Sequence, residues 1–408
     1  MKAAGIVAEY NPLHNGHVYH ISRTRELTGC DAVVVAMSGN FVQRGMPAVW
    51  DKWTRAEHAL RNGADLVLEI PVLHCLADAG RYASAGVRLI ESTGIADCIS
   101  FGSESGDAEL LTATSDFIRR NIKELRDGIK ALRTEGLSYP AAREKMFIKL
   151  GCPDGAAALL NSPNDILALE YILAMEKAEP IVIRREGAGY NDGAEEPGCT
   201  FMSATGIRAM LDGGKDISPY VPECVACTAG CCEQGADVLF DLVRFALLGS
   251  SGEDIDDCPS GGEGLGNLLK KGARSAGSLD ELIMSAKSRR YTYTRISRLC
   301  MQILLGIKRN DFASGAVTGP ETGIPDPGYI RVLGFTDAGR ELLSEIKREK
   351  TASLPVLTNI NKEAQDLSDT AKKMLDLDIH ASDIYNLIRG NLLDASCDQI
   401  HKPVISFL

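Results

Sequence analysis

The sequence predicts an α/β protein in which a Rossmann-like, doubly wound parallel sheet is followed by a mostly helical C-terminal domain. Three observations carry this prediction. Short β-rich runs alternate with helical segments through the first half of the chain. These β-rich runs are continuously apolar, as strands are when helices cover both faces of a sheet. After about residue 222 the alternation stops and the segments become mostly helical.

The first half contains the strands and helices of the expected sheet. Strands are expected at Ala3–Ala8, Ala32–Met37, Asp65–Ile70, Asp97–Phe101 and Pro180–Ile183. Helices are expected at His17–Leu27, Lys52–Asn62, Arg81–Glu91, Ala108–Arg126, Ala141–Leu150 and Asp165–Lys177. Strands that alternate with helices form βαβ units, and such sheets bind ligands beyond the carboxyl ends of their strands.

The second half is expected to be helical with one strand. Helices are predicted at Glu223–Leu248, Asp280–Ile307, Ala338–Glu349, Lys362–Asp376 and Ser382–Asn391, and a strand at Tyr329–Phe335. Loops are predicted at Gly249–Gly266, which is rich in Gly, Ser and Asp, and at the Pro/Gly turn Gly323–Gly328. We therefore divide the chain into a sheet domain over residues 1–215 and a helical domain over residues 216–408.

Composition excludes several classes of protein. A chain of 408 residues suggests two or three domains, and 45% hydrophobic with 24% charged residues is typical of a soluble globular protein. No apolar run approaches the ~20 residues of a membrane helix, and the N-terminus lacks a secretory core, so we expect a cytoplasmic protein without a membrane partner. The 12 cysteines are expected to be thiols. A net charge of −11 argues against nucleic-acid binding through the whole surface, but it leaves room for a local basic patch.

The densest cluster of chemically active residues directly follows the first expected strand. His14, His17 and His20 are three of the seven histidines in the chain. His14 and His17 are three residues apart, so they share one face at the start of a helix. A helix N-terminus offers unpaired N–H groups and a positive dipole end, which suit a phosphate. Two imidazole donors there predict that the site stabilises a phosphate during displacement.

Metal binding is the competing interpretation of these histidines, and a purely structural turn is another. No carboxylate or fourth ligand stands at a fixed spacing that would complete a zinc site. Four thiols lie close together at Cys224, Cys227, Cys231 and Cys232. They lack a second distant pair, so we interpret them as helix-packing residues and predict no protein-bound metal.

Two motifs carry a family resemblance. The segment His14-Asn-Gly-His17 resembles the HxGH motif of the nucleotidyltransferase superfamily that includes class I aminoacyl-tRNA synthetases. The segment Ser203-Ala-Thr-Gly-Ile-Arg208 resembles the second motif of that superfamily, with Ser203 as the N-cap of a helix. Their order and separation, at opposite ends of the five-strand pattern, imply an HxGH nucleotidyltransferase fold.

A narrower resemblance covers nearly the whole chain. It rests on Gly5–His17, Met37–Gly45, Phe101–Glu104, Ser162–Tyr171, Arg184–Gly187 and Arg289–Arg295. These segments are similar to bacterial tRNA(Met) cytidine acetate ligases. The resemblance implies an enzyme that makes acetyl-adenylate from acetate and ATP. It then transfers the acetyl group to N4 of the wobble cytidine of elongator tRNA(Met), forming N4-acetylcytidine.

The resemblance also implies roles for individual residues. His14, His17 and Arg208 would be catalytic. The ATP site would be lined by Val7, Ala8, Glu9, Tyr10, Asn11, Pro12, Leu13, His14, Asn15, Gly16, His17, Val18, Tyr19, His20, Gly102, Asn164, Arg184, Arg185, Ser203 and Thr205. Mg²⁺ is expected with ATP, bridging the phosphates with few protein ligands.

Two further sets of residues are expected to contact the other substrates. The nearest polar candidates for the acetate carboxylate are Gln43, Arg44 and Lys52, although Arg44 and Lys52 could equally be solvated surface charges. The stretch 287–298 carries basic and aromatic residues without a carboxylate, which is typical of a face that contacts RNA phosphates and bases. The predicted tRNA-binding residues are Lys287, Arg289, Arg290, Tyr291, Tyr293, Arg295 and Arg298. The alternative is a solvated helix face with its tyrosines in the core.

Two rival functions stay open. A small-metabolite nucleotidyltransferase of the pantetheine-phosphate or nicotinamide-mononucleotide type would leave nearly half the chain without a purpose. A nucleotide-responsive RNA-binding protein that has lost catalysis is disfavoured by the presence of His14, His17 and Arg208. The sequence predicts no oligomeric state.

Overall fold

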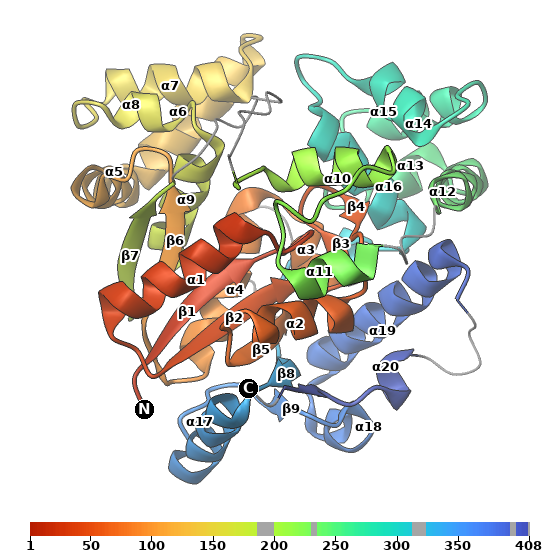
Figure 1. The fold of residues 1–408 in the computed structure, drawn as a ribbon. Helices are drawn as coiled ribbons and strands as arrows, with labels where there is room; N and C mark the ends of the chain where they lie inside the picture. The colour runs from red at the N-terminus through yellow and green to blue at the C-terminus, as the bar shows by residue number, and fades with distance from the viewer. Residues whose placement is uncertain (186–199, 230–234, 312–323, 392–396, 407–408) are drawn as a thin grey trace.

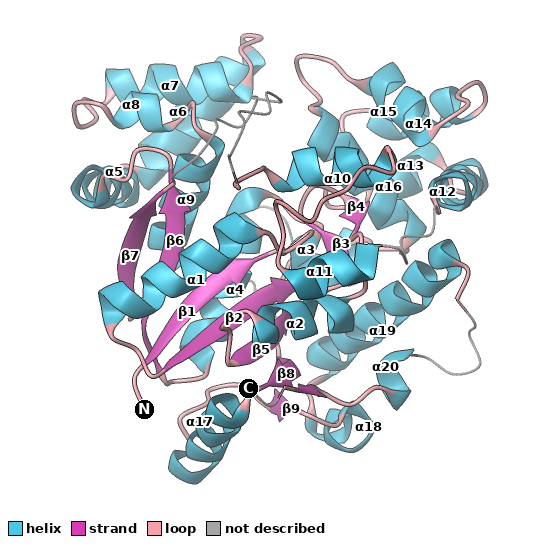
Figure 2. Cartoon of the chain, in the orientation of Figure 1, coloured by secondary structure: helices cyan, strands magenta, loops and turns pink. Residues whose placement is uncertain are grey.

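The computed structural model describes residues 1–185, 200–229, 235–311, 324–391 and 397–406. In these residues one sheet runs in the order β10-β8-β5-β2-β1-β6-β7, with β9 also paired to β8 (Figures 1 and 2). The strands are β1 Ala3–Ala8, β2 Ala32–Ser38, β5 Leu66–Ile70, β6 Ala96–Ser103, β7 Glu179–Arg184, β8 Ile330–Phe335, β9 Val356–Leu357 and β10 Val404–Ile405. A separate hairpin joins β3 Phe41–Val42 to β4 Met46–Pro47. The predicted α/β class with a mostly parallel sheet is confirmed.

Helices cover both faces of the sheet. On one face lie α1 Asn15–Thr28 and α2 Lys52–Arg61, and on the other α4 Ala79–Ser92, α9 Pro163–Ala174 and α17 Asp337–Glu349. Neighbouring residues of β2 alternate between the two cores, with Val33 and Val35 on the α1 face and Val34 on the α4 face. The α4 helix approaches β1 very closely, since a Cβ added to Gly86 would lie 2.5 Å from Val7.

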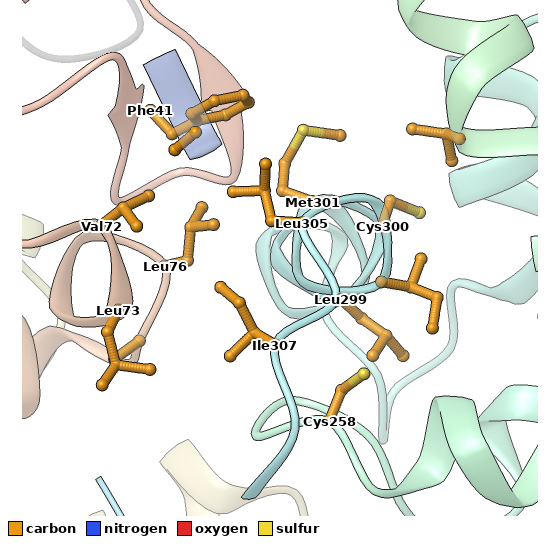
Figure 3. Packing of buried hydrophobic residues seen from close by; sticks show 14 of the residues in the cluster. Phe41, Val72, Leu73, Leu76, Cys258, Leu299, Cys300, Met301, Leu305 and Ile307 are labelled. Carbon is orange, nitrogen blue, oxygen red and sulfur yellow. The ribbon is translucent and has the colours of Figure 1, made fainter. Parts of the chain in front are cut away.

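The remaining helices cover the ends and sides of this sheet. They are α3 Val72–Cys75, α5 Ala108–Arg120, α6 Ile122–Thr134, α7 Tyr139–Lys149, α8 Ala156–Leu159, α10 Ala204–Asp212, α11 Glu223–Thr228, α12 Ala236–Gly249, α13 Gly252–Asp256, α14 Leu265–Ala273, α15 Leu279–Ala286, α16 Tyr293–Leu304, α18 Ile360–Glu363, α19 Asp369–Arg389 and α20 Cys397–Ile400. Figure 3 shows α16 packed against the β3–β4 hairpin and α3 through Phe41, Val72, Leu76 and Met301. The helical bundle that contains α16 is therefore attached to the carboxyl end of the sheet.

Several predicted helices have the wrong limits because side-chain caps end them. The segment Ala108–Arg126 is two helices, since the amide of Asn121 donates a hydrogen bond to the carbonyl oxygen of Phe117 at 2.8 Å. The segment Asp280–Ile307 is also two helices, and Thr292 caps the second one by accepting from the N–H of Arg295.

Other limits differ as well. Two predicted helices after residue 362 are one continuous helix from 369 to 389, preceded by a short one. The predicted loop over 249–266 contains α13, which begins with a capping box between Ser251 and Asp254. The predicted helix over 223–248 is divided into α11 and α12, with Gly235 outside the helical conformation and residues 230–234 outside the described part.

The sheet takes strands from both sides of the predicted boundary at residue 215. The β8 strand pairs antiparallel with β5, with Leu66 opposite Phe335 and Glu69 opposite Arg331. In turn, β9 and β10 pair parallel with β8. The boundary therefore does not separate the sheet from the helical half of the chain.

A buried network of charges fixes β8 and the C-terminal segment to the sheet. The Nζ atom of Lys52 lies 2.8 Å from Oε1 of Glu69 and 2.7 Å from Oδ2 of Asp398. The guanidinium of Arg331 lies 2.8 Å from the same Asp398 oxygen and 3.2 Å from Oε2 of Glu69. Burial alone would lower the pKa of Arg331, but the two carboxylates raise it. Two cations and two anions balance, so the network is stable only as a set.

No helix in the described part of the chain is both long and apolar enough to cross a membrane.

We predict that Lys52→Met strongly destabilises the fold, because it leaves two buried carboxylates against one guanidinium. The free energy of unfolding from urea titration should fall by about 3–5 kcal/mol. The control is Arg23→Ala, which removes an exposed ion pair with Glu26 and should change it by less than about 1 kcal/mol. Similar losses in the two variants would contradict the role given to this network.

Candidate active site

Buried polar contacts fix the loop between β1 and α1. The guanidinium of Arg55, fully buried, donates to the carbonyl oxygen of Glu9 at 2.7 Å. The side-chain oxygen of Asn11 accepts from the N–H of Val49 at 2.8 Å. Tyr10 is buried with φ +46°, a left-handed conformation that is unusual for a residue with a side chain. The loop therefore has one fixed course.

His14 and His17 cap the start of α1 reciprocally. Nδ1 of His14 accepts from the N–H of Gly16 at 3.1 Å, and Nδ1 of His17 accepts from the N–H of His14 at 3.3 Å. The two rings stack with centroids 3.7 Å apart. A ring nitrogen that accepts from an N–H carries no proton, so the proton of each neutral ring is on Nε2. Both Nε2 atoms are therefore hydrogen-bond donors.

Burial keeps these imidazoles neutral. It lowers the pKa of His14 to about 3, with Arg185 and Arg208 lowering it further by their charge. It lowers the pKa of His17 well below the usual value, helped by the neighbouring His14 and by Arg185. His20 has a pKa lowered to about 4 by burial and by Arg185. At neutral pH the rings are therefore uncharged donors.

Arg208 reaches this loop from α10. Ser203 caps that helix by accepting from the N–H of Gly206 at 3.1 Å, as predicted. The guanidinium of Arg208 donates to the carbonyl oxygen of Asn11 at 2.6 Å and to the hydroxyl of Thr205 at 3.0 Å. Its charge also acts on His14. The structure thus brings His14, His17 and Arg208 together.

A second arginine, Arg185, lies near the histidine cluster, since its charge acts on His14, His17 and His20. The N–H of Arg185 donates to the carbonyl oxygen of Ser103 at 2.9 Å, and the side chain lies across Gly102. A Cβ on Gly102 would be 3.3 Å from Cγ of Arg185, so this glycine makes room for an arginine. Similarly, Gly16 makes room for the ring of His14, whose Cε1 would be 3.0 Å from an added Cβ.

Other predicted ATP-site residues are committed to structural contacts. The amide of Asn15 donates to the carbonyl oxygens of Thr200 and Pro219 at 3.0 and 3.1 Å. Nε2 of His20 lies 3.0 Å from the hydroxyl of Ser100. The amide of Asn164 donates to Glu104 at 2.5 Å.

Four more residues of the predicted ATP-site set contact other parts of the protein. Tyr10 and Leu13 are fully buried and shape the loop from inside. Val7 lies against Gly86. Arg184 lies against Gly106, and a Cβ added to Gly106 would be 2.7 Å from the Cβ of Arg184. These residues can support the site, but their contacts are with protein.

The three acetate candidates have different surroundings. Lys52 is a wrong prediction, because its ammonium is fully buried and occupied by Glu69 and Asp398. The N–H of Gln43 donates to Oε1 of Glu9 at 2.8 Å, next to the histidine loop. Burial lowers the pKa of Arg208, and the charge of Arg44 lowers it further, so Arg44 lies close enough to Arg208 for the two charges to interact.

The predicted tRNA face is divided between exposed and structural side chains. Lys287, Arg289 and Arg290 are exposed in the turn before α16. Arg290 pairs with Glu263 at 2.8 Å. The hydroxyls of the half-buried tyrosines are engaged too, and Tyr291 donates to the carbonyl oxygen of Glu263.

The later members of this set face inward. Tyr293 donates to Asp280 at 3.0 Å, and Arg295 donates to the carbonyl oxygen of Ser260 at 3.0 Å. Arg298 donates to the carbonyl oxygen of Gln43 at 3.4 Å. They hold α16 in place against its neighbours.

The predicted cysteine cluster falls only partly within the described residues. Cys224 is half-buried and accepts from the amide of Asn62 at 3.2 Å, and Cys227 is exposed. Cys231 and Cys232 lie outside the described part. Within that part, no group of three or more His, Cys, Asp or Glu side chains is placed to hold a metal ion.

Sequence reasoning missed the carboxylates that fix the loop after β6. Glu104 accepts from the N–H of Asp165 at 2.9 Å, and Asp165 accepts from the hydroxyl of Ser103 and the N–H of Ser105. These residues hold the segment on which Arg185 rests. No local pattern reveals them, since the partners are about sixty positions apart.

Fold and site together define a nucleotidyl transferase. Residues 1–399 match the family described as HIGH Nucleotidyl Transferase, and the chain belongs to it. It belongs more narrowly to the tRNA(Met) cytidine acetate ligase family. A protein of that name from Caldanaerobacter subterraneus subsp. tengcongensis is 37% identical, with 99% of this chain and 100% of the relative covered. One from Clostridium novyi is 35% identical, with 96% of each covered.

Solved structures agree with this assignment. Thermotoga maritima TmcAL bound with alpha-thio ATP superposes with a TM-score of 0.87 at 30% identity, and both chains are covered completely. The apo form of the same protein gives a TM-score of 0.89 with the same identity and coverage. The resemblance and the fold expected from the sequence are thus confirmed.

We predict that His14 and His20 stay neutral down to about pH 5 in the folded protein, because their pKa values are lowered to about 3 and 4. Imidazole ¹⁵N shifts should show His14 protonated on Nε2 throughout that range. The unfolded chain gains these protons near pH 6.5, so acidification below that pH should reduce stability. A titration of either ring near pH 6.5 would contradict the described burial.

Proposed function

We propose that this protein is an ATP-dependent tRNA(Met) cytidine acetate ligase. It activates acetate as acetyl-adenylate and transfers the acetyl group to N4 of the wobble cytidine of elongator tRNA(Met). The single observation that carries this proposal is the convergence of two Nε2 donors, on His14 and His17, with the guanidinium of Arg208. Full-length similarity to proteins of that name supports the choice of substrates.

In the first step an acetate oxygen attacks the α-phosphorus of ATP in line, and pyrophosphate leaves. This displacement requires positioning and charge stabilisation rather than a protein nucleophile. His14 and His17 donate from Nε2 to phosphate oxygens that gain charge. Arg208 and Arg185 supply the positive charge, and Ser203 and Thr205 lie at the start of α10 beside the departing phosphates.

The hydrogen-bond donors and guanidiniums of the site also indicate how Mg²⁺ would be held. The groups that converge here are N–H donors and guanidiniums, which suit phosphate oxygens rather than a metal ion. Mg²⁺ arriving with ATP would neutralise phosphate charge while held chiefly by phosphate oxygens and water.

The second substrate reaches the site from the side of α16. The exposed Lys287, Arg289 and Arg290 are the residues of the predicted tRNA face best placed to contact phosphates. A tRNA substrate supports the cytoplasmic location expected from the sequence. A small-metabolite nucleotidyltransferase is disfavoured, because the relatives named as acetate ligases match along the entire chain. Loss of catalysis is disfavoured by the intact donor geometry.

The direct test incubates the protein with labelled acetate, ATP and total bacterial tRNA, followed by nucleoside analysis. We expect label in N4-acetylcytidine, with release of AMP and pyrophosphate. Activity that instead requires a phosphorylated metabolite would contradict this proposal and favour the small-metabolite rival.

We predict that His17→Ala slows formation of acetyl-adenylate by about 10²–10³-fold with ATP affinity nearly kept, because its Nε2 donor acts on the developing charge. Trapping acetyl-adenylate with hydroxylamine measures the rate, and equilibrium binding measures affinity. The control is the exposed His380→Ala, which should change neither quantity. An unchanged rate in His17→Ala would remove the proposed donor role.

We predict that Arg289→Ala weakens tRNA binding and lowers the slope of log affinity against log salt by about 1, since one phosphate contact is lost. Acetyl-adenylate formation should be unaffected. The control is Arg348→Ala, an exposed arginine on α17 at the opposite end of the molecule from α16 (Figure 1). An unchanged salt slope in Arg289→Ala would contradict a tRNA face at this turn.

A further inference from the structure

Glu9 lies at the carboxyl end of β1, between the ATP-site loop and the hairpin β3–β4. Its Oε1 atom accepts from the N–H of Gln43 at 2.8 Å. No described residue donates a hydrogen bond to its Oε2 atom. This atom is also not among the polar atoms that are buried without a hydrogen-bond partner. The side chain is half-buried. One carboxylate oxygen is therefore fixed, and the other has no hydrogen-bond donor among the described residues.

The charged and titratable groups on which the charge of Glu9 acts come from four helices. They are Arg55 of α2, Tyr82 of α4, Tyr171 of α9 and Arg208 of α10. Burial raises the pKa of both tyrosines, so they stay protonated at neutral pH. Arg208 is the group that links Glu9 to the histidine cluster, since its charge also acts on His14.

The same hairpin connects Glu9 to the predicted tRNA face. Arg298 of α16 donates to the carbonyl oxygen of Gln43, and the hydroxyl of Ser297 donates to the carbonyl oxygen of Gly45 at 2.8 Å. The approach is close enough that a Cβ on Gly45 would be 2.3 Å from the nitrogen of Arg298. Glu9 is therefore joined through Gln43 to α16, the helix that directly follows the exposed basic turn 287–290.

The histidines are unsuited to accept a proton in this site. His14 and His17 use Nδ1 as an acceptor and carry their proton on Nε2, so neither ring has a free basic nitrogen. Nε2 of His20 is engaged with Ser100. Burial lowers the pKa values of these rings, which makes them weak bases as well.

The neighbouring carboxylates are occupied or lie outside the site. Both oxygens of Glu104 accept from the start of α9, and Asp165 accepts from the loop after β6. Both oxygens of Asp51 accept from the first turn of α2. Asp212 is exposed at the end of α10. This leaves Glu9 with an open oxygen.

We propose that Glu9 is the general base of the acetyl transfer, an inference that rests on the proposed function. The N4 amine of the cytidine attacks the carbonyl carbon of acetyl-adenylate, the N–C bond forms, and the bond from that carbon to the phosphate oxygen breaks. AMP leaves with the electron pair. The proton of N4 passes to Oε2 of Glu9 and from there to water. The amine needs this base because conjugation with the ring makes its nitrogen weakly nucleophilic.

The decisive variant is Glu9→Gln, whose amide oxygen can still accept from the N–H of Gln43 but cannot take a proton. Acetyl-adenylate is formed first on the enzyme from labelled acetate, and tRNA is then added in a single turnover. We expect transfer to be slower by about 10²–10⁴-fold. Hydroxylamine trapping should show that acetyl-adenylate formation falls far less than transfer does, because acetate is already an anion and that step needs no base.

Two further measurements separate this role from a structural one. The pH profile of single-turnover transfer is measured for the wild type and for Glu9→Gln; profiles of different shape support the base role, whereas profiles of the same shape at different rates support a structural role. The matched control is Asp212→Asn, which removes the other carboxylate that attracts Arg208 and should transfer at the normal rate. Unfolding of each variant, followed by circular dichroism, confirms that the compared proteins are folded. If Glu9→Gln is unfolded, Glu9→Asp replaces it, and a transfer rate with the wild-type pH dependence but a lower plateau is then expected.

The possible outcomes distinguish a failure of the role of Glu9 from a failure of the proposed function. Normal transfer by Glu9→Gln, or an equal loss of acetyl-adenylate formation, would overturn the role of Glu9. If hydroxylamine yields no acetyl-hydroxamate with the wild-type enzyme, acetate and ATP, the proposed function itself is wrong.

Discussion

The hydrogen bond from Arg208 to the carbonyl oxygen of Asn11 is the contact on which the site depends. It is 2.6 Å long and joins residues 197 positions apart. Without α10 the loop after β1 would keep its two histidines and the nearby Arg185 but would lack the guanidinium of Arg208. Because the donor is charged and its acceptor belongs to a fixed loop, this bond also sets the distance between the guanidinium and the imidazoles. The two motifs therefore meet only through a contact between segments far apart in the chain.

Burial then divides the work between neutral and charged groups. The imidazoles are uncharged, stacked donors whose tautomer is fixed by backbone N–H groups. The positive charge comes from Arg208 and Arg185, which approach from α10 and from the end of β7. A rigid set of donors needs little reorganisation when charge develops on a phosphate. In the proposed transfer step, Oε2 of Glu9 adds a proton acceptor beside these donors.

The sequence predicted what local patterns encode. Apolar runs located the longer strands β1, β2, β5, β6, β7 and β8, but not the two-residue strands β3, β4, β9 and β10. The two motifs pointed to His14, His17 and Arg208, which lie close together in the structure. Lys52 was wrongly predicted to bind acetate, because no residue near it in the sequence indicates its ion pair with Asp398, which is 346 positions away. The pairing of β8 with β5 escaped prediction for the same reason, since pairing depends on register rather than local composition. The helix break at Asn121 depends on one side-chain cap, and the space beside Gly102 belongs to Arg185.

A double-mutant cycle between His17 and Arg208 tests the central claim most directly. The rate of acetyl-adenylate formation is measured for wild type, His17→Ala, Arg208→Ala and the double variant. If both side chains act on one triphosphate in the transition state, the double variant should lose less than the sum of the single losses, with a coupling energy of about 1–3 kcal/mol. Losses that add to within about 0.5 kcal/mol would mean that the two side chains act independently, and would contradict a shared site.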